Sequence, residues 1–346
     1  MTKEPLKIRL RNNLLALLMP LLFVITAVIA IFIIHHHTST ARPVLNVLNW
    51  TSYIPQSIID DFEEEYNIQV NYTTYSSNEE LLAKLTSSQQ GTYDLIFPSD
   101  YMVELMVEQD LLQPLDQSKL ENLSNLNFLF LNQPFDQENT YSLPFLFATT
   151  VLVSEDGLTS LTDLFDEKYR NSVALLDDER VIISAMLATA GADLNSTDDA
   201  DLAASLTQFE KLKQNIKAFD SDSPKSLFLT GEVTAGYIWS AEALLAQAAN
   251  PDLKITYPTE GYTISMDNYC IPVGAKHADS AYLFIDYLLR PEVATAIVDS
   301  YPYISPNTAA TTLTATEIQS ILENGTYVKN VGSDIKKLDR LWAQYK

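Results

Sequence analysis

Aromatic and polar residues follow the ends of four apolar segments that have the pattern of β-strands. The four clusters are residues 50–53 (WTSY), 99–101 (SDY), 177–178 (DD) and 239–240 (WS). In open α/β sheets, ligands bind outside the carboxyl ends of the strands, so these clusters are predicted to converge on one cleft. Carboxylates pair with ammonium groups, while ring faces pack against methylene groups and attract the cation. This combination of side chains suits a polyamine.

Sequence signatures of enzymes are sparse. The sequence has no G-x-S-x-G, P-loop or H-E-x-x-H motif. Apart from the triplet at 35–37, its one histidine is His277, and its one cysteine, Cys270, lies in an apolar stretch that is typical of an inert buried thiol. We therefore predict no catalytic residue, no metal site and no cofactor. The alternative is an exported glycoside hydrolase that uses Asp178 and Asp267 as acid and base.

Alternating strand and helix patterns are expected to position the clusters. The predicted strands are residues 44–48, 68–75, 94–97, 172–176 and 234–238. Segments with helical periodicity separate and follow these strands. This alternation is the signature of an α/β fold with parallel strand pairs.

The N-terminal segment, residues 1–42, is predicted to be a membrane anchor. Residues 14–34 form an uncharged apolar stretch, and about 20 such residues suffice for a transmembrane helix. The basic residues that precede this stretch should stay in the cytoplasm, which places the rest of the chain on the extracytoplasmic face of the membrane. The alternative is a cleaved signal, because Ser39 and Ala41 are small residues with the spacing of a cleavage site after Ala41. Cleavage would release the protein into the periplasm.

The chain is strongly acidic. Its 346 residues include 45 Asp and Glu against 22 Lys and Arg, for a net charge of −23. This balance argues against a nucleic-acid partner, which requires clustered Lys and Arg. The 47% of hydrophobic residues excludes a disordered acidic tail, and the length predicts two domains. The acidity suits a cationic partner; alternatively, it only keeps protein molecules apart in solution, because their negative surfaces repel one another.

From residue 45 to about residue 310 the chain resembles the extracytoplasmic spermidine/putrescine-binding proteins of polyamine ABC transporters. The matching segments are residues 49–55 (NWTSYIP), 93–99 (YDLIFPS), 132–136 (NQPFD), 218–222 (AFDSD), 231–233 (GEV), 288–291 (LLRP) and 303–307 (YISPN). The resemblance implies an α/β, two-lobed periplasmic-binding-protein fold of type II, whose lobes close about a hinge over a ligand cleft. It also implies a polyamine ligand and the permease subunits of an ABC transporter as partners. The implied lobes are residues 43–147 with 266–311, and residues 148–265 with 312–346.

Ligand-binding positions of that family carry over to this chain residue by residue. The residues so implied are Trp50, Thr51, Tyr53, Ser99, Tyr101, Asp178, Trp239, Asp267 and Tyr303. Asp178 and Asp267 are implied as ammonium-binding carboxylates, the aromatic residues as walls around the alkyl chain, and Thr51 and Ser99 as hydrogen-bonding hydroxyls.

Three positions depart from the family pattern. Val181 stands in place of a Glu, Ser265 in place of a Trp, and Val328 in place of a Gln. The loss of one acid and one ring favours putrescine or another short amine over the triply charged spermidine. Compensation by Glu242, Tyr262 or Tyr269 is the alternative within this hypothesis. Outside it, the alternatives are a binding protein for another organic cation or an amino-acid derivative, and a sensor or scaffold that uses the same fold.

Overall fold

A computed structural model describes residues 42–51 and 53–346. The chain divides into two compact units, Met1–Pro43 and Val44–Lys346, and the description below concerns the second. The predicted transmembrane stretch, residues 14–34, lies outside the described residues. Within the described residues, no helix combines the length and the apolar character that crossing a membrane requires.

The first half of this unit is built from alternating strands and helices, as predicted. Its elements are β1 (Val44–Trp50), α2 (Gln56–Tyr66), β2 (Gln69–Tyr75), α3 (Asn78–Ser87), β3 (Leu95–Ile96) and α4 (Asp100–Glu108). Strand β1 pairs in parallel with both β2 and β3. Helix α2 buries Ile58, Ile59 and Phe62, the apolar stripe that its helical periodicity predicts. We call the region around β1–β3 the β1 lobe.

The second half repeats this arrangement. Its elements are β5 (Val173–Leu175), α5 (Glu179–Thr189), α6 (Asp199–Leu212), β6 (Ile216–Phe219), α7 (Lys225–Leu229), β7 (Ala235–Trp239), α8 (Ser240–Ala249) and β8 (Lys254–Thr256). Strand β5 pairs in parallel with β6 and β7. The predicted α/β class with parallel strand pairs is therefore confirmed. We call the region around β5–β8 the β7 lobe.

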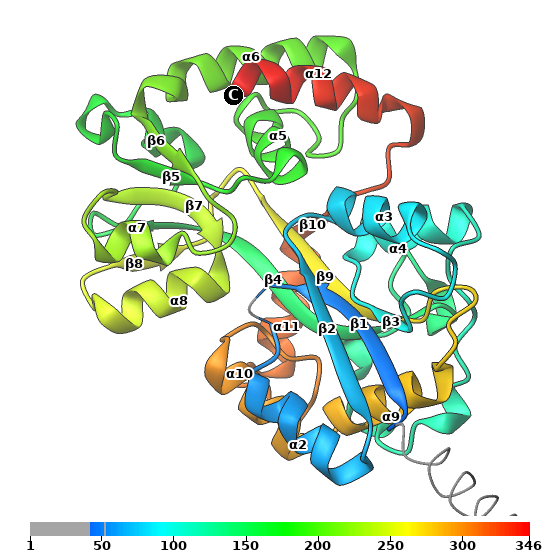
Figure 1. Cartoon of the computed structure of the whole chain (residues 1–346). Coiled ribbons are helices and arrows are strands. Elements are labelled where there is room, and N and C mark those ends of the chain that lie inside the picture. The colour runs from blue at the N-terminus through cyan, green and yellow to red at the C-terminus, as the bar shows by residue number, and fades with distance from the viewer. Residues whose placement is uncertain (1–41, 52) are drawn as a thin grey trace, which may run out of the picture. The chain divides into compact units, whose positions relative to one another are not determined.

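Two long strands, β4 (Ser142–Ser154) and β9 (Tyr262–Cys270), join the lobes. Every residue of β4 is buried. Its first part pairs antiparallel with β9, from Ser142 to Thr149, and its second part pairs with β7 from Thr150 onward. Among the described residues the ten strands form one sheet in the order β2-β1-β3-β9-β4-β7-β5-β6, with β8 and β10 added to β4 and β9. Figure 1 shows β4 and β9 running from the blue β1 lobe to the green β7 lobe.

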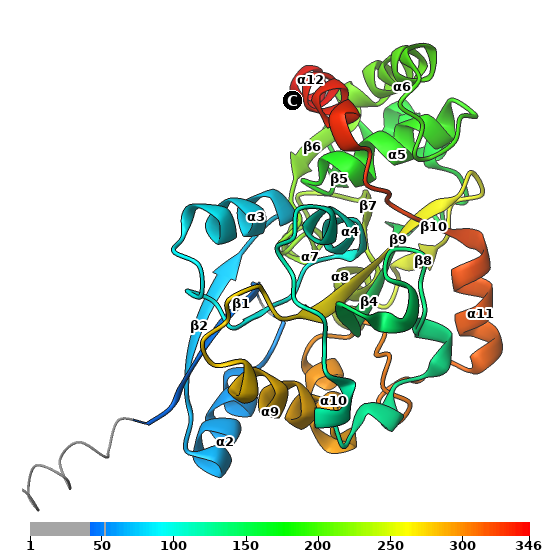
Figure 2. The same cartoon turned by 90° about the vertical axis from the view of Figure 1, so that its right-hand side faces the viewer.

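The C-terminal part of the chain returns to both lobes. Its elements are α9 (Ala278–Leu288), α10 (Pro291–Ser300), α11 (Ala315–Asn324), β10 (Gly325–Tyr327) and α12 (Ile335–Tyr345). Pro291 is the first residue of α10, where its missing N–H costs no helical hydrogen bond. Figures 1 and 2 both place the red helix α12 beside α5 and α6 of the β7 lobe.

Each lobe has its own apolar core. In the β1 lobe, Leu45 of β1 and Phe62 of α2 belong to one cluster with Phe284 of α9. In the β7 lobe, Leu152 of β4 and Leu341 of α12 belong to another. Two separately packed cores joined by two long strands are the arrangement that a hinge between rigid bodies requires. The lobe boundaries implied by the resemblance remain a prediction.

Candidate ligand-binding site

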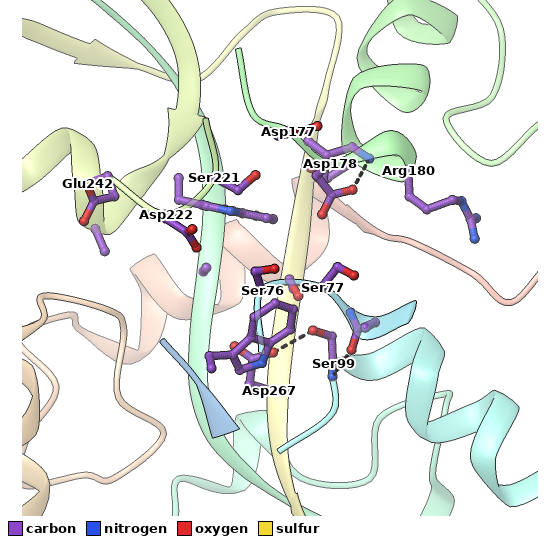
Figure 3. A pocket seen from close by; sticks show the side chains of 18 of the residues that line it. Ser76, Ser77, Ser99, Asp177, Asp178, Arg180, Ser221, Asp222, Glu242 and Asp267 are labelled. Carbon is purple, nitrogen blue, oxygen red and sulfur yellow. Dashed lines mark hydrogen bonds between the residues drawn. The ribbon is translucent and has the colours of Figure 1, made fainter. Parts of the chain in front are cut away.

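Residues from both lobes line a cavity of about 550 Å³. All nine residues that the sequence singled out lie in this lining: Trp50, Thr51, Tyr53, Ser99, Tyr101, Asp178, Trp239, Asp267 and Tyr303. Figure 3 shows Asp267 and Ser99 below the cavity and Asp178 above it in that view. The structure thus brings together residues that are up to 253 positions apart in the sequence.

Strand ends explain why these residues meet. Trp50 is the last residue of β1, and Ser99 follows β3 and precedes α4. In the β7 lobe, Asp178 precedes α5, and Trp239 ends β7 directly before α8. Carboxyl ends of parallel strands lie at one edge of a sheet, so each lobe presents its loops to the same cavity.

Asp267 is a buried carboxylate on β9, with only 5% of its surface exposed. The Ser99 hydroxyl donates to its Oδ1 at 2.6 Å, and the Tyr53 hydroxyl donates to its Oδ2 at 2.9 Å. Burial raises its pKa to about 6, although these hydrogen bonds stabilise the charged form and oppose the shift. Among the described residues no Lys or Arg forms an ion pair with it. Asp267 is therefore a buried, hydrogen-bonded carboxylate that has no cationic partner among the described residues.

Asp178 provides a second carboxylate from the other lobe. Its Oδ1 accepts a hydrogen bond from the Val181 N–H at 3.0 Å and so caps the N-terminus of α5. Burial raises its pKa to about 6, and the negative charge of Glu79 adds to the shift. Asp178 is partly exposed to solvent, whereas Asp267 is buried, and two carboxylates with raised pKa in one cavity are a typical feature of a functional site.

Aromatic rings surround Asp267. Tyr53 stacks on Trp50 with ring centres 6.1 Å apart and contacts Tyr303 with ring centres 4.9 Å apart. The indole N–H of Trp50 donates to the Phe97 carbonyl at 3.0 Å, which fixes the plane of the ring. The Thr51 hydroxyl donates to a backbone carbonyl of β2 rather than standing free. Rings held in this way offer apolar walls for an alkyl chain and negative faces for a cation.

Tyr101 is engaged by a cation of the chain itself, which the sequence did not predict. The guanidinium carbon of Arg180, on α5 of the β7 lobe, lies 5.5 Å from the centre of the Tyr101 ring, on α4 of the β1 lobe. Arg180 is buried and donates to the Lys329 carbonyl at 2.7 Å. The Tyr101 hydroxyl donates to Glu79 at 3.0 Å. Tyr101 therefore contributes to a contact between the lobes as well as to the cavity wall.

Several further acidic side chains line the cavity. They are Glu79, Asp100, Asp177, Glu179, Asp220, Asp222 and Glu242, while Arg180 is the single cationic residue in the described lining. Asp177 pairs with Lys346 at 2.6 Å, and Glu242 pairs with Lys225 at 2.8 Å. The lining is consequently far more negative than positive, which concentrates cations there. Glu242, which the sequence suggested only as an alternative compensating side chain, lines the cavity three residues after Trp239.

The three departures from the family pattern, Val181, Ser265 and Val328, all line the cavity. Of the alternatives for compensation, Glu242 lines the cavity, whereas Tyr262 and Tyr269 do not. Tyr269 is buried against Phe97 and Phe145 in the β1 lobe, and Tyr262 stacks on Tyr257. Compensation by either tyrosine is therefore wrong. Among the described residues no group of three or more His, Cys, Asp or Glu is arranged to hold a metal ion.

Comparisons with known proteins agree with this geometry. The family model described as bacterial extracellular solute-binding protein matches residues 57–321. The spermidine/putrescine-binding periplasmic protein of Escherichia coli is 36% identical over 300 residues, which cover 82% of this chain and 86% of that protein.

Solved structures give the same result. A structure assigned to a spermidine/putrescine ABC transporter of Listeria monocytogenes has 32% identity and a TM-score of 0.81, covering 87% of this chain and 98% of that one. The spermidine/putrescine ABC transporter substrate-binding protein of Streptococcus pneumoniae has 32% identity and a TM-score of 0.73, with 88% and 98% covered. The two-lobed periplasmic-binding-protein fold is confirmed, and a binding protein is favoured over an enzyme. As the resemblance in its sequence predicted, this chain belongs to the family of bacterial extracellular solute-binding proteins.

Proposed function

We propose that this protein captures a polyamine outside the cell and delivers it to the permease of an ABC transporter. The observation that carries the proposal is the pair of carboxylates, the partly buried Asp178 and the buried Asp267, that face one cavity from opposite lobes. Each has a raised pKa because burial disfavours its charge, and an ammonium group would offset that cost. The names of the relatives, which are spermidine- and putrescine-binding proteins, support the same ligand class.

In the proposed complex, the two carboxylates pair with the ammonium groups of the ligand. Trp50, Tyr53 and Trp239 enclose the alkyl chain, together with Tyr101 and Tyr303. The hydroxyl of Ser99 keeps Asp267 oriented, because it already donates to that carboxylate at 2.6 Å. Thr51 lies at the edge of the cavity, where it is exposed. An unpaired buried ammonium would be strongly unfavourable, so both carboxylates are needed for a diamine.

Thermal unfolding with and without ligand tests the proposal. A ligand at 100 times its Kd stabilises the folded state by about 2.7 kcal/mol. Putrescine and spermidine at millimolar concentration should therefore raise the melting temperature, whereas the uncharged 1,4-butanediol should not. An unchanged melting temperature with every polyamine would overturn the assignment. A panel of other organic cations and amino-acid derivatives would then identify the ligand class, and turnover of glycosides would point to a hydrolase.

We also infer a hinge through β4 and β9, with lobes of residues 43–147 with 266–311 and residues 148–265 with 312–346. The separate cores of the two lobes support this division. Small-angle scattering should show a smaller radius of gyration when ligand is added. Residues 1–42 are proposed to anchor the protein to the membrane, and fractionation of cells that express the full chain would test this. Recovery in the soluble periplasmic fraction would favour cleavage after Ala41.

A further inference from the structure

Glu242 is a carboxylate of the cavity lining that the proposed function does not use. It lies in the first turn of α8, three residues after Trp239, and only 7% of its surface is exposed. The Tyr303 ring lies within reach of its charge: burial raises the pKa of Tyr303, and the negative charges of Asp267 and Glu242 add to the shift. A ligand chain that runs from Asp267 along Trp239 and Tyr303 would therefore approach Glu242.

Glu242 already has an ammonium partner within the chain. Lys225, at the start of α7, places its Nζ 2.8 Å from one carboxylate oxygen of Glu242 and 3.1 Å from the other. Lys225 is not part of the cavity lining. Its side chain keeps 31% of its surface exposed, against 9% for that of Glu242. In Figure 3 Glu242 lies on the opposite side of the cavity from Asp178 and Arg180.

We propose that Lys225 is a specificity-determining residue: it keeps the Glu242 carboxylate in an ion pair and thereby makes the site prefer a diamine to a triamine. This inference rests on the proposed polyamine function. A third ligand ammonium that reached Glu242 would meet a carboxylate already neutralised by Lys225. It would then lose its hydration without gaining an ion pair, which is unfavourable. Among the described residues, neither Asp178 nor Asp267 forms an ion pair with a Lys or Arg, although the charge of Arg180 acts on Asp178, so both remain available for two ammonium groups.

The other acidic groups near Glu242 do not replace it. Asp222, which lies toward the same side in Figure 3, is exposed to solvent, where an ion pair contributes little. Asp220 uses its Oδ1 to accept the backbone N–H groups of Asp222 and Ser223. On this side of the cavity, a third ammonium therefore gains a strong partner only if Glu242 is released.

Isothermal titration calorimetry with putrescine and spermidine tests the inference on three variants and the unaltered protein. Lys225→Met releases Glu242 and should strengthen spermidine binding relative to putrescine binding by at least about tenfold, which is 1.4 kcal/mol. The double variant Lys225→Met/Glu242→Gln removes the released carboxylate and should return the ratio of the two Kd values to that of the unaltered protein. Lys337→Met is the matched control, because this lysine of the β7 lobe is similarly exposed (34%) and pairs with Asp199 and Asp334, which do not line the cavity.

The ratio of Kd values separates this role from a merely structural one. If the Lys225–Glu242 pair only joins α7 to α8, Lys225→Met would lower stability and weaken both ligands by a similar factor. That result, or an unchanged ratio, would overturn the inference. Thermal unfolding of each variant without ligand shows whether it folds, and the double variant, which buries no unpaired carboxylate at this point, provides a second comparison if Lys225→Met is unstable. Binding by the unaltered protein tests the proposed function separately, and absence of any polyamine binding would overturn both.

Discussion

Replacing Asp267 by Asn should weaken ligand binding and, at the same time, increase the free energy of unfolding of the protein without added ligand. The loss of binding follows from the proposed ammonium contact. Truncating one partner of a buried, hydrogen-bonded charge pair costs about 2–5 kcal/mol, and each 1.4 kcal/mol is tenfold in Kd. The Kd for putrescine should therefore rise by a factor of about 30 to several thousand.

The gain in stability follows from the pKa of the Asp267 carboxyl group in the folded protein without added ligand. Burial raises this pKa from 3.8 to about 6, and one pKa unit corresponds to 1.36 kcal/mol. An acid whose pKa is higher in the folded state loses stability as the pH rises from about 4 through 6, so above pH 7 the ionised Asp267 costs the fold about 3 kcal/mol. The amide of Asn carries no charge but offers one acceptor in place of two to the hydroxyls of Ser99 and Tyr53. We subtract about 1 kcal/mol for that imperfect hydrogen bond, which leaves a gain of about 2 kcal/mol.

Urea unfolding of the empty protein at pH 8 and pH 4, with calorimetry at pH 8, measures both effects. The gain should be present at pH 8 and should largely vanish at pH 4, where Asp267 is itself protonated. The matched control is Asp94→Asn, because Asp94 is also buried in the β1 lobe but does not line the cavity. Asp94 accepts the backbone N–H groups of Asn46 and His277 at 2.9 Å each, so this variant should lose about 1–3 kcal/mol of stability without a change in Kd. An Asp267→Asn protein that binds putrescine normally, or is less stable at pH 8, would refute the reasoning.

Three further outcomes follow from the same contacts. Burial raises the pKa of both Asp178 and Asp267 to about 6, so the affinity for putrescine should fall as the pH drops below 6. Calorimetry in buffers of different ionisation enthalpy should show that protons are released on binding. An affinity that does not change between pH 5 and pH 8 would contradict this prediction. Trp239→Leu should weaken putrescine binding about 2- to 30-fold, as the loss of a cation–π contact of about 0.5–2 kcal/mol predicts, and an unchanged Kd in the same titration would exclude the ring from the site. Arg180→Gln should lower the melting temperature of the empty protein, because Arg180 contacts the Tyr101 ring and the Lys329 carbonyl without any ligand, and it should change the Kd values of putrescine and spermidine by the same factor. A selective effect on one ligand would instead place Arg180 in direct contact with that ligand.

The βα units could be predicted because their sequence patterns are local. The run at 44–48 is confirmed as β1, which continues to Trp50, and the run at 234–238 is confirmed as β7, which ends at Trp239. Asp178 could be placed at a helix start because a carboxylate there accepts backbone N–H groups and suits the helix dipole.

The two strands that join the lobes could not be predicted in this way. Strand β4 is buried on both faces, so it lacks the alternation of a half-buried strand, and it contains Pro144, which normally argues against a strand interior. The structure accommodates Pro144 at an irregularity in the pairing between β4 and β9. Strand β9 contains Asp267 and Asn268, residue types that are depleted in strands. Both polar residues interrupt the strand pattern: Asp267 lines the cavity, whereas the Asn268 side chain donates to the Met266 carbonyl at 2.7 Å.

The sequence could indicate that residues at strand ends lie together in one cavity, but it could not indicate contacts that depend on a partner residue. The topology of an α/β sheet brings Trp50, Ser99 and Asp178 to one edge whatever their contacts are. By contrast, nothing in the sequence shows that Lys225 reaches Glu242, 17 positions away, or that Arg180 covers the Tyr101 ring across the cleft. Such pairs depend on how helices pack against one another in three dimensions, and local sequence patterns carry no information about this packing.

The electrostatics of the cavity lining indicate where the affinity for a ligand would come from. The hydrogen bonds to Asp178 and Asp267 come from neutral donors, a backbone N–H and two hydroxyls, and the positive charge of Arg180 opposes only part of the rise in the pKa of Asp178. Their raised pKa values measure a free-energy cost that the folded protein bears only while the cavity lacks a cation. A ligand ammonium would remove this cost as it binds. Part of the binding free energy would therefore come from the loss of an unfavourable electrostatic term that the folded protein already carries. Glu242 already pairs with Lys225, and in the proposed site this difference from Asp178 and Asp267 would favour a ligand with two ammonium groups over a ligand with three.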